Sequence, residues 1–116
     1  MYGVTSAGAV FHFDANSYEV KWREENNDYQ FLCMDIDKSG KHLFAGEKSS
    51  RIILFDLQNN KKIREFEAGS NQNVAHVNRV FSVKSFSDDR FVFASGGWDS
   101  VVNIWDLRQK RVIFFF

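Results

Sequence analysis

Hydrophobic and polar residues alternate in short runs along most of the chain. In the C-terminal half, the runs 81–86, 91–95 and 102–105 carry Phe, Val, Ile or Trp at nearly every second position. Clusters of Ser, Asp, Gly and Asn separate these runs over lengths typical of hairpin connections. No segment shows the convincing spacing of an amphipathic helix. The pattern predicts short antiparallel β-strands, with a polar connecting loop over residues 68–74.

The strand pattern repeats along the chain. Residues 31–57 align without a gap with residues 81–107, at an offset of 50. A weaker copy opens the chain, where residues 9–14 match residues 51–56 at an offset of 42. Four short strands in each unit of about 40 to 50 residues, joined as a meander, are the layout of a propeller blade. We therefore predict an all-β fold, a partial β-propeller made of four-stranded antiparallel blades.

The last unit resembles the WD-repeat family. An Ala-His pair at 75–76 stands where the family has Gly-His, and the Trp-Asp dipeptide that names the family lies at 105–106, its Trp 29 residues beyond the histidine. A serine and a turn aspartate occupy the family's two intervening polar positions. The resemblance implies a hydrogen-bond chain that runs through Asp99, His76, Ser95 and Trp105. Such a chain fixes one geometry, because breaking any link leaves a buried polar group without a partner.

The second unit departs from this pattern at all four positions. Asn26 falls at the histidine position, Ala45 at the serine, Ser49 at the aspartate and Phe55 at the tryptophan. We expect this blade to rely on apolar packing alone.

The repeat also predicts how the chain is divided. Residues 1–25 are expected to form an incomplete first blade, residues 26–67 a degenerate second repeat, and residues 76–116 a third and best-matched repeat that is truncated. This amounts to about two and a half blades, and propellers contain about 4 to 8. Three adjacent apolar residues, 114–116, close the chain. We therefore expect residues 1–116 to be a fragment of a larger propeller.

Composition narrows the possible partners and cofactors. Lysine plus arginine number 15, as do aspartate plus glutamate, so the formal charge is zero and neither nucleic acid nor a membrane is an expected partner. The single cysteine, Cys33, favours a reducing compartment, which predicts an intracellular location in cytoplasm or nucleus. The histidines His12, His42 and His76 lack ligand-like spacing. No metal and no other cofactor is expected.

The resemblance also indicates a binding surface. In the family, the residue before the turn aspartate and the residues three and five beyond the histidine face partner proteins. These positions predict a protein-binding rim formed by Arg79, Phe81 and Trp98 of the third unit and Tyr29, Phe31 and Lys48 of the second. Trp, Tyr and Arg are the residue types that dominate interaction hot spots.

Catalysis is not expected, although His76, Ser95 and Asp99 are the residue types of a hydrolase triad. The surroundings of Ser95 contain no nucleophile-elbow motif. We expect a non-catalytic WD-repeat scaffold that binds other proteins or peptides. Two alternatives remain open. One is a substrate receptor of a cullin-type ubiquitin ligase, because residues 105–108 show the Trp-Asp-x-Arg pattern, with Arg108 as the adaptor contact. The other is the propeller portion of a multidomain enzyme.

Overall fold

The structure is a computed structural model that describes residues 1–67, 76–89, 91–109 and 111–116, without the side chains of residues 111, 114 and 115. The polar loop expected at 68–74 and the paired phenylalanines at 114–115 therefore fall outside the described residues or side chains. The described part contains β-strands and no helix, so none that could cross a membrane. The strands are β1 (Tyr2–Val4), β2 (Ala9–Asp14), β3 (Glu19–Glu25), β4 (Phe31–Ile36), β5 (His42–Glu47), β6 (Ile52–Asp56), β7 (Lys61–Phe66), β8 (Val80–Ser85), β9 (Val92–Gly97), β10 (Val102–Asp106) and β11 (Arg111–Phe115).

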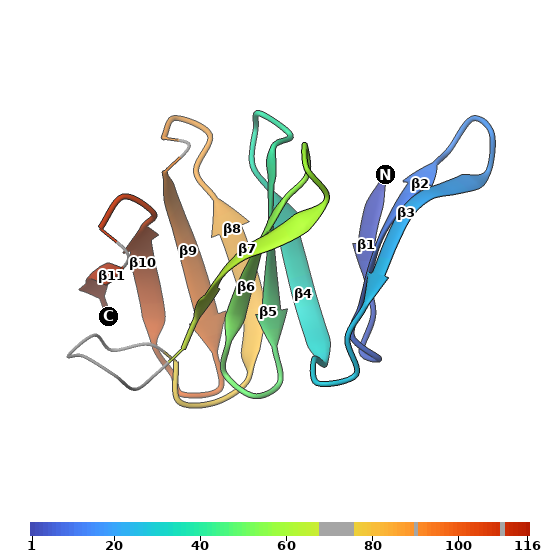
Figure 1. Ribbon diagram of the computed structural model, residues 1–116. Coiled ribbons are helices and arrows are strands. Elements are labelled where there is room, and N and C mark those ends of the chain that lie inside the picture. The colour runs from blue at the N-terminus through green and yellow to red at the C-terminus, as the bar shows by residue number, and fades with distance from the viewer. Residues whose placement is uncertain (68–75, 90, 110) are drawn as a thin grey trace.

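The strands form three antiparallel sheets that stand next to one another (Figure 1). We call β1-β2-β3 blade 1, β4-β5-β6-β7 blade 2 and β8-β9-β10-β11 blade 3. Each blade is a meander in which strands adjacent in sequence are adjacent in the sheet. Strand β4 lies against β8 of blade 3 and against β1 of blade 1. The prediction of an all-β chain with four-stranded antiparallel blades is confirmed.

A turn built around an aspartate joins the last two strands of every blade. Asp14, Asp56 and Asp106 each end a strand, and one carboxylate oxygen accepts a hydrogen bond from a backbone N–H two residues later, at 2.8 Å in all three. Tyr18 and Asn60 then adopt left-handed backbone conformations, with φ of 58° and 53°. These two residues are 42 positions apart, which is the offset of the weak repeat. The aspartate of the Trp-Asp dipeptide therefore forms a turn, because its short side chain can replace a backbone acceptor.

Blade 2 is buried on both faces. Toward blade 1, Leu43, Ala45, Ile53 and Phe55 join a cluster with Val10. Toward blade 3, the alternate residues Phe44, Ile52, Leu54 and Phe66 join a second cluster with Val80, Val83, Phe93 and Trp105. Successive side chains of a strand point to opposite faces. The sequence 52–55 is accordingly apolar at every position and does not alternate.

Blades 2 and 3 approach closely at Gly46. A Cβ atom there would lie 2.6 Å from Cys33 Sγ and 2.7 Å from Val80 Cγ1. At the equivalent position of blade 3, a Cβ on Gly96 would meet nothing nearer than 4.0 Å. Burial raises the pKa of the Cys33 thiol to about 11, so this cysteine is a protonated core residue.

A chain of hydrogen bonds joins the strands of blade 3. The Trp105 indole N–H donates to Ser95 Oγ at 2.8 Å, and Ser95 Oγ lies 2.7 Å from His76 Nε2. His76 Nδ1 lies 2.8 Å from Asp99 Oδ2. A proton on Nδ1 satisfies every group, because Ser95 then donates to His76 and His76 donates to Asp99. His76 is 0% exposed, so a substrate cannot reach its ring.

One buried amide lies beside this chain without a partner. Asn103 on β10 is fully buried, and neither Nδ2 nor Oδ1 has a hydrogen-bond partner in the described structure. Its register partner on β9 is Ser95, and the equivalent residue of blade 2 is Ile53. An unsatisfied buried polar group costs about 1–3 kcal/mol. Asn103 therefore lowers the stability of this strand.

Replacing Ser95 with alanine is expected to lower the free energy of unfolding by about 1–3 kcal/mol, because the Trp105 indole N–H and His76 Nε2 both lose their partner. Urea denaturation followed by tryptophan fluorescence measures the change. Ser82→Ala on β8, where the serine is exposed, is the matched control. Equal effects of the two substitutions would contradict a structural role for the Ser95 hydroxyl.

Replacing Asn103 with isoleucine is expected to raise the free energy of unfolding by about 1–3 kcal/mol, because it removes two unsatisfied polar atoms and fills the same space with apolar atoms. The midpoint of urea denaturation reports the gain. Asn103→Ala is the comparison, since it removes the amide but leaves a cavity. If Asn103→Ile destabilises the chain more than Asn103→Ala does, the Asn103 amide has hydrogen-bond partners and the prediction is wrong.

Candidate functional site

Three predicted rim residues form one exposed cluster at the start of β8 and the end of β9. The rings of Phe81 and Trp98 lie 5.2 Å apart, and the Arg79 guanidinium carbon lies 4.8 Å from the centroid of the Trp98 ring. Trp98 is 61% exposed and Phe81 is 42% exposed. We call Arg79, Phe81 and Trp98 the aromatic cluster. An exposed Trp with a stacked arginine is the kind of surface that hot spots use.

Backbone contacts and the buried hydrogen-bond chain hold the turn that carries Trp98. The Trp98 N–H donates to the Arg79 carbonyl at 3.0 Å. The strands come so close that a Cβ on Gly97 would lie 2.3 Å from this carbonyl oxygen, so the position requires glycine. The next residue, Asp99, also accepts from the N–H groups of Val77 at 3.1 Å and Val101 at 3.2 Å. The aromatic cluster is therefore attached to a rigid turn.

The charge of Asp99 is stabilised inside this turn. Burial alone would raise the pKa of its carboxyl. The hydrogen bond from His76 and those from the backbone of Val77 and Val101 outweigh burial and hold the pKa below its usual value. Asp99 is thus committed to His76 and does not offer a free carboxylate beside Trp98.

Two of the predicted rim residues are not on the rim, and this part of the prediction is wrong. Tyr29 and Phe31 are only 5% and 3% exposed, and they pack in the cluster between blades 1 and 2. Their rings lie 5.4 Å apart, and Phe31 also packs edge-on against Phe55. Blade 1 covers these two aromatic residues, so in blade 2 the equivalent positions serve the core.

Lys48 is the one rim residue of blade 2 that is exposed. It lies in the turn between β5 and β6, which is equivalent to the turn that carries Trp98. The Lys48 N–H donates to the Gln30 carbonyl at 3.0 Å. A shallow pocket of about 270 Å³ is lined here by Asp28, Gln30, Glu47, Lys48 and Ser49.

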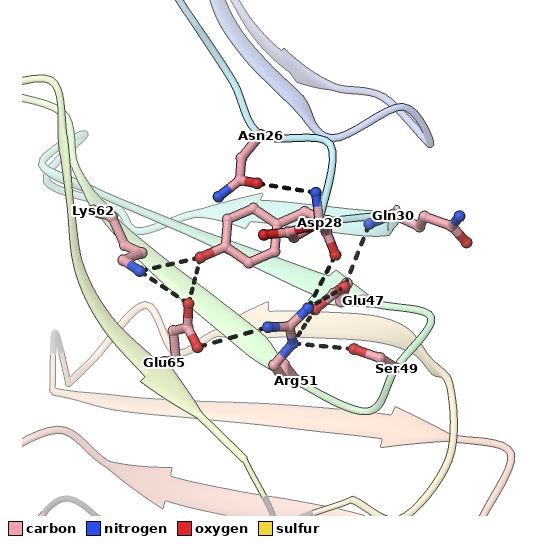
Figure 2. A network of polar contacts seen from close by, with 9 residues as sticks. Asn26, Asp28, Gln30, Glu47, Ser49, Arg51, Lys62 and Glu65 are labelled. Carbon is pink, nitrogen blue, oxygen red and sulfur yellow. Dashed lines mark hydrogen bonds and ion pairs between the residues drawn. The ribbon is translucent and has the colours of Figure 1, made fainter.

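Blade 2 does not rely on apolar packing alone, which corrects the expectation from its missing family residues. Arg51 occupies the centre of a polar network (Figure 2). Its Nε donates to Glu47 Oε2 at 2.6 Å and its Nη2 donates to Glu47 Oε1 at 2.8 Å. Nη2 also donates to the Asp28 carbonyl at 3.1 Å, and Nε to Ser49 Oγ at 3.0 Å. The arginine thereby ties its own turn to the segment that precedes β4. We call this network the Arg51 clamp.

The clamp extends to the outer strand through Glu65. Arg51 Nη1 lies 3.8 Å from Glu65 Oε2, and Lys62 Nζ donates to Glu65 Oε1 at 2.9 Å. The Tyr29 hydroxyl donates to the same Glu65 oxygen and accepts from Lys62 at 3.1 Å. In Figure 2, the side chains of Arg51 and Lys62 both point toward Glu65. Polar contacts thus hold Tyr29 in the position that buries its ring.

The shifts in pKa within the clamp have clear causes. The hydrogen bond from Tyr29 lowers the pKa of Glu65, and the hydrogen bond to Glu65 raises the pKa of Lys62 to about 12. Burial, followed by the bond to Glu65, raises the pKa of Tyr29. Glu65 and Lys62 are therefore charged near neutral pH, and Tyr29 is protonated. In the alignment of the repeats, Glu47 and Arg51 stand opposite Gly97 and Val101, and this charged pair was the missed signal.

The Trp-Asp-x-Arg segment lies at the other end of blade 3. Arg108 Nε and Nη2 donate to the two carboxylate oxygens of Asp106 at 2.9 and 2.8 Å, and its guanidinium carbon lies 4.9 Å from the centroid of the Phe91 ring. His42, on blade 2, pairs with Asp37 at 2.8 Å. Among the described residues, no group of three or more His, Cys, Asp or Glu could hold a metal ion.

Replacing Arg51 with methionine is expected to lower the free energy of unfolding by about 3 kcal/mol, because the buried Glu47 carboxylate loses its partner. The double variant Arg51→Met with Glu47→Leu should lose less than the single variant. Chemical denaturation of Arg51→Met, of Glu47→Leu and of the double variant tests this non-additivity. Arg23→Met is the control, because the Arg23–Glu25 pair is exposed and such pairs contribute about 0–1 kcal/mol. A double variant as unstable as the sum of both single losses would exclude direct coupling.

The chain is similar in sequence to known proteins. The family model of the WD domain, G-beta repeat, matches residues 69–106. The chain is 32% identical over 88 residues to the "Probable di- and tripeptidase DUG2" of Saccharomyces cerevisiae, with 75% of this chain and 10% of that protein covered. It is 35% identical over 85 residues to the "Periodic tryptophan protein 2 homolog" of Schizosaccharomyces pombe, with 72% and 9% covered. The chain thus spans about a tenth of the length of each of these relatives.

A solved structure shows the same fold. The crystal structure of RRP9 WD40 repeats superposes with a TM-score of 0.85 at 16% sequence identity, over 99% of this chain and 34% of that one. The structural match confirms the propeller-type arrangement of the blades, and the sequence match falls on the unit that contains His76, Ser95 and the Trp-Asp dipeptide. The chain belongs to the WD-repeat β-propeller family.

Proposed function

We propose that the chain is an interaction-bearing part of a non-catalytic WD-repeat scaffold, and that the aromatic cluster is where a partner protein or peptide docks. The observation that carries this proposal is the exposure of Trp98 on a turn that the buried hydrogen-bond chain makes rigid. A rigid apolar anchor loses little conformational entropy on binding. The polar groups of that chain are buried and mutually satisfied, which supports a structural role for His76, Ser95 and Asp99.

Lys48 extends the proposed surface onto blade 2. It lies on the turn equivalent to that of Trp98, and the Arg51 clamp fixes this turn by bonding to Glu47 and Ser49 on either side of Lys48. The two turns lie at the same end of their blades (Figure 1). Tyr29 and Phe31 contribute to this surface only indirectly, by packing beneath it.

The alternative of a propeller portion in a multidomain enzyme has one observation in its favour, the similarity to a protein named a di- and tripeptidase. That similarity covers 10% of the named protein. For the ubiquitin-ligase alternative, the proposed adaptor contact Arg108 is engaged by Asp106 within its own turn. Stabilisation of this turn is enough to account for Arg108, and no contact with a ligase adaptor is needed to explain it.

Replacing Trp98 with alanine is expected to weaken partner binding at least about tenfold, which is the loss of about 1.4 kcal/mol that a hot-spot residue exceeds. Affinity capture from cell extract with quantitative mass spectrometry compares the variant with the native chain. Ile63→Ala on β7 is the matched control, because Ile63 is also a large exposed apolar residue. Thermal unfolding should be nearly unchanged in both variants. Unaltered capture by Trp98→Ala would refute the proposed surface.

A further inference from the structure

We propose that the aromatic cluster selects an acidic peptide segment, in which a side-chain carboxylate binds Arg79 and an adjacent apolar side chain packs on Phe81 and Trp98. The inference rests on the proposed function and specifies the chemistry of the partner. It follows from the state of Arg79, from the charges on the surrounding edge and from the exposed apolar surface.

Arg79 differs from the other arginines whose side chains the structure describes. Each of the others donates a hydrogen bond to an oxygen of this chain: Arg23 to Glu25, Arg51 to Glu47, Arg64 to the Leu107 carbonyl and Arg108 to Asp106. For Arg79, the described residues supply no acceptor to the guanidinium, and its one recorded side-chain contact is the stack on Trp98. The guanidinium donors of Arg79 are therefore available to a ligand.

The contact with the Trp98 ring restrains the Arg79 side chain. A guanidinium that lies on an aromatic ring keeps its N–H groups in the plane of the group, where they can bind a carboxylate in a bidentate manner. The backbone of Arg79 is also fixed, because its carbonyl accepts from Trp98 at 3.0 Å and its N–H donates to Asn78 Oδ1 at 2.8 Å. Both restraints reduce the entropy lost when an anion binds.

The neighbouring carboxylates are mostly engaged elsewhere. Asp99 is held by His76, and Glu47 is held by Arg51. Lys48 on blade 2 has no ion-pair partner among the described residues, and the exposed carboxylate near it is that of Asp28, which lines the same shallow pocket. The edge thus presents Arg79 as a free cation and Lys48 as a second one, which favours an anionic ligand and repels a cationic one.

The apolar surface beside Arg79 points to a peptide rather than a nucleic acid. Val77, which is exposed, donates its backbone N–H to Asp99 and so lies next to the Trp98 turn. Val77, Phe81 and Trp98 together offer surface for an aliphatic or aromatic side chain. Binding to a phosphate backbone requires an extended track of cations. One guanidinium flanked by apolar groups matches a single carboxylate beside an apolar residue.

Indole N–H signals in a nuclear magnetic resonance spectrum of the ¹⁵N-labelled chain provide the test. The chain has three tryptophans, so each signal can be assigned by substitution. The probe is a short synthetic peptide with one leucine and one phenylalanine among aspartates and glutamates. We expect this peptide to shift the Trp98 signal and to leave the Trp105 signal in place, because the Trp105 indole is bonded to Ser95 in the core. A version with lysines in place of the acidic residues, and a mixed-sequence RNA oligonucleotide, should leave Trp98 unshifted.

Variants separate charge from geometry. Arg79→Gln should weaken binding of the acidic peptide about tenfold, which equals the loss of about 1.4 kcal/mol. The affinity of Arg79→Lys should lie between those of the native chain and Arg79→Gln, because lysine keeps the positive charge but cannot bind a carboxylate in a bidentate manner. Lys61→Gln is the matched control. Lys61 lies on blade 2, at the end opposite to the Lys48 turn, so this variant should bind the peptide as the native chain does.

Three results would overturn the inference. They are no Trp98 shift with the acidic peptide, an equal shift with a neutral peptide that has glutamines in place of the acidic residues, or a larger shift with RNA. The second result leaves docking on the aromatic cluster intact. Failure of the proposed function would instead appear as partner capture that is insensitive to Trp98→Ala. The two failures are therefore distinguishable.

Discussion

Burial of both faces of blade 2 is the constraint on which the rest of the structure depends. A four-stranded sheet cannot bury its own faces, so its apolar residues must be covered by neighbouring sheets. Leu43 and Ile53 face blade 1, whereas Phe44 and Ile52 face blade 3. This packing sets the order of the blades and brings their turns to a common edge. The exposed positions at that edge are those that neither cluster uses.

Two different polar systems hold equivalent turns in blades 2 and 3. In blade 3, His76 accepts a hydrogen bond from Ser95 and donates one to Asp99, which holds the turn before β10. In blade 2, Arg51 performs the same task with four hydrogen bonds and an ion pair to Glu65. The solutions share one requirement, that each buried polar group finds a partner. Blade 2 lacks the family's polar residues, but the Arg51 clamp replaces their hydrogen bonds, so the turn stays fixed.

Because the buried polar residues of blade 3 are already paired with one another, they are poor candidates for catalysis. Ser95 is bonded on one side to the Trp105 indole and on the other to His76, and both are buried. The surface beyond them consists of the aromatic cluster. At this edge the structure presents the Arg79 guanidinium, Lys48 and apolar side chains, which are kinds of group that binding surfaces use.

The sequence by itself determined the strands and the repeat, and its resemblance to the WD-repeat family indicated the hydrogen-bond chain of blade 3, because each depends on residues within one unit. The family resemblance also predicted Arg79, Phe81 and Trp98 as rim residues, from their positions relative to the histidine and the turn aspartate. Only the tertiary structure decided the fate of Tyr29 and Phe31, since burial there depends on contacts with blade 1 that lie far away in the sequence. The Arg51 clamp likewise joins Asp28, Glu47 and Glu65 across separate strands. Charges in a sequence do not reveal their partners, because pairing is set by where the folded strands bring them.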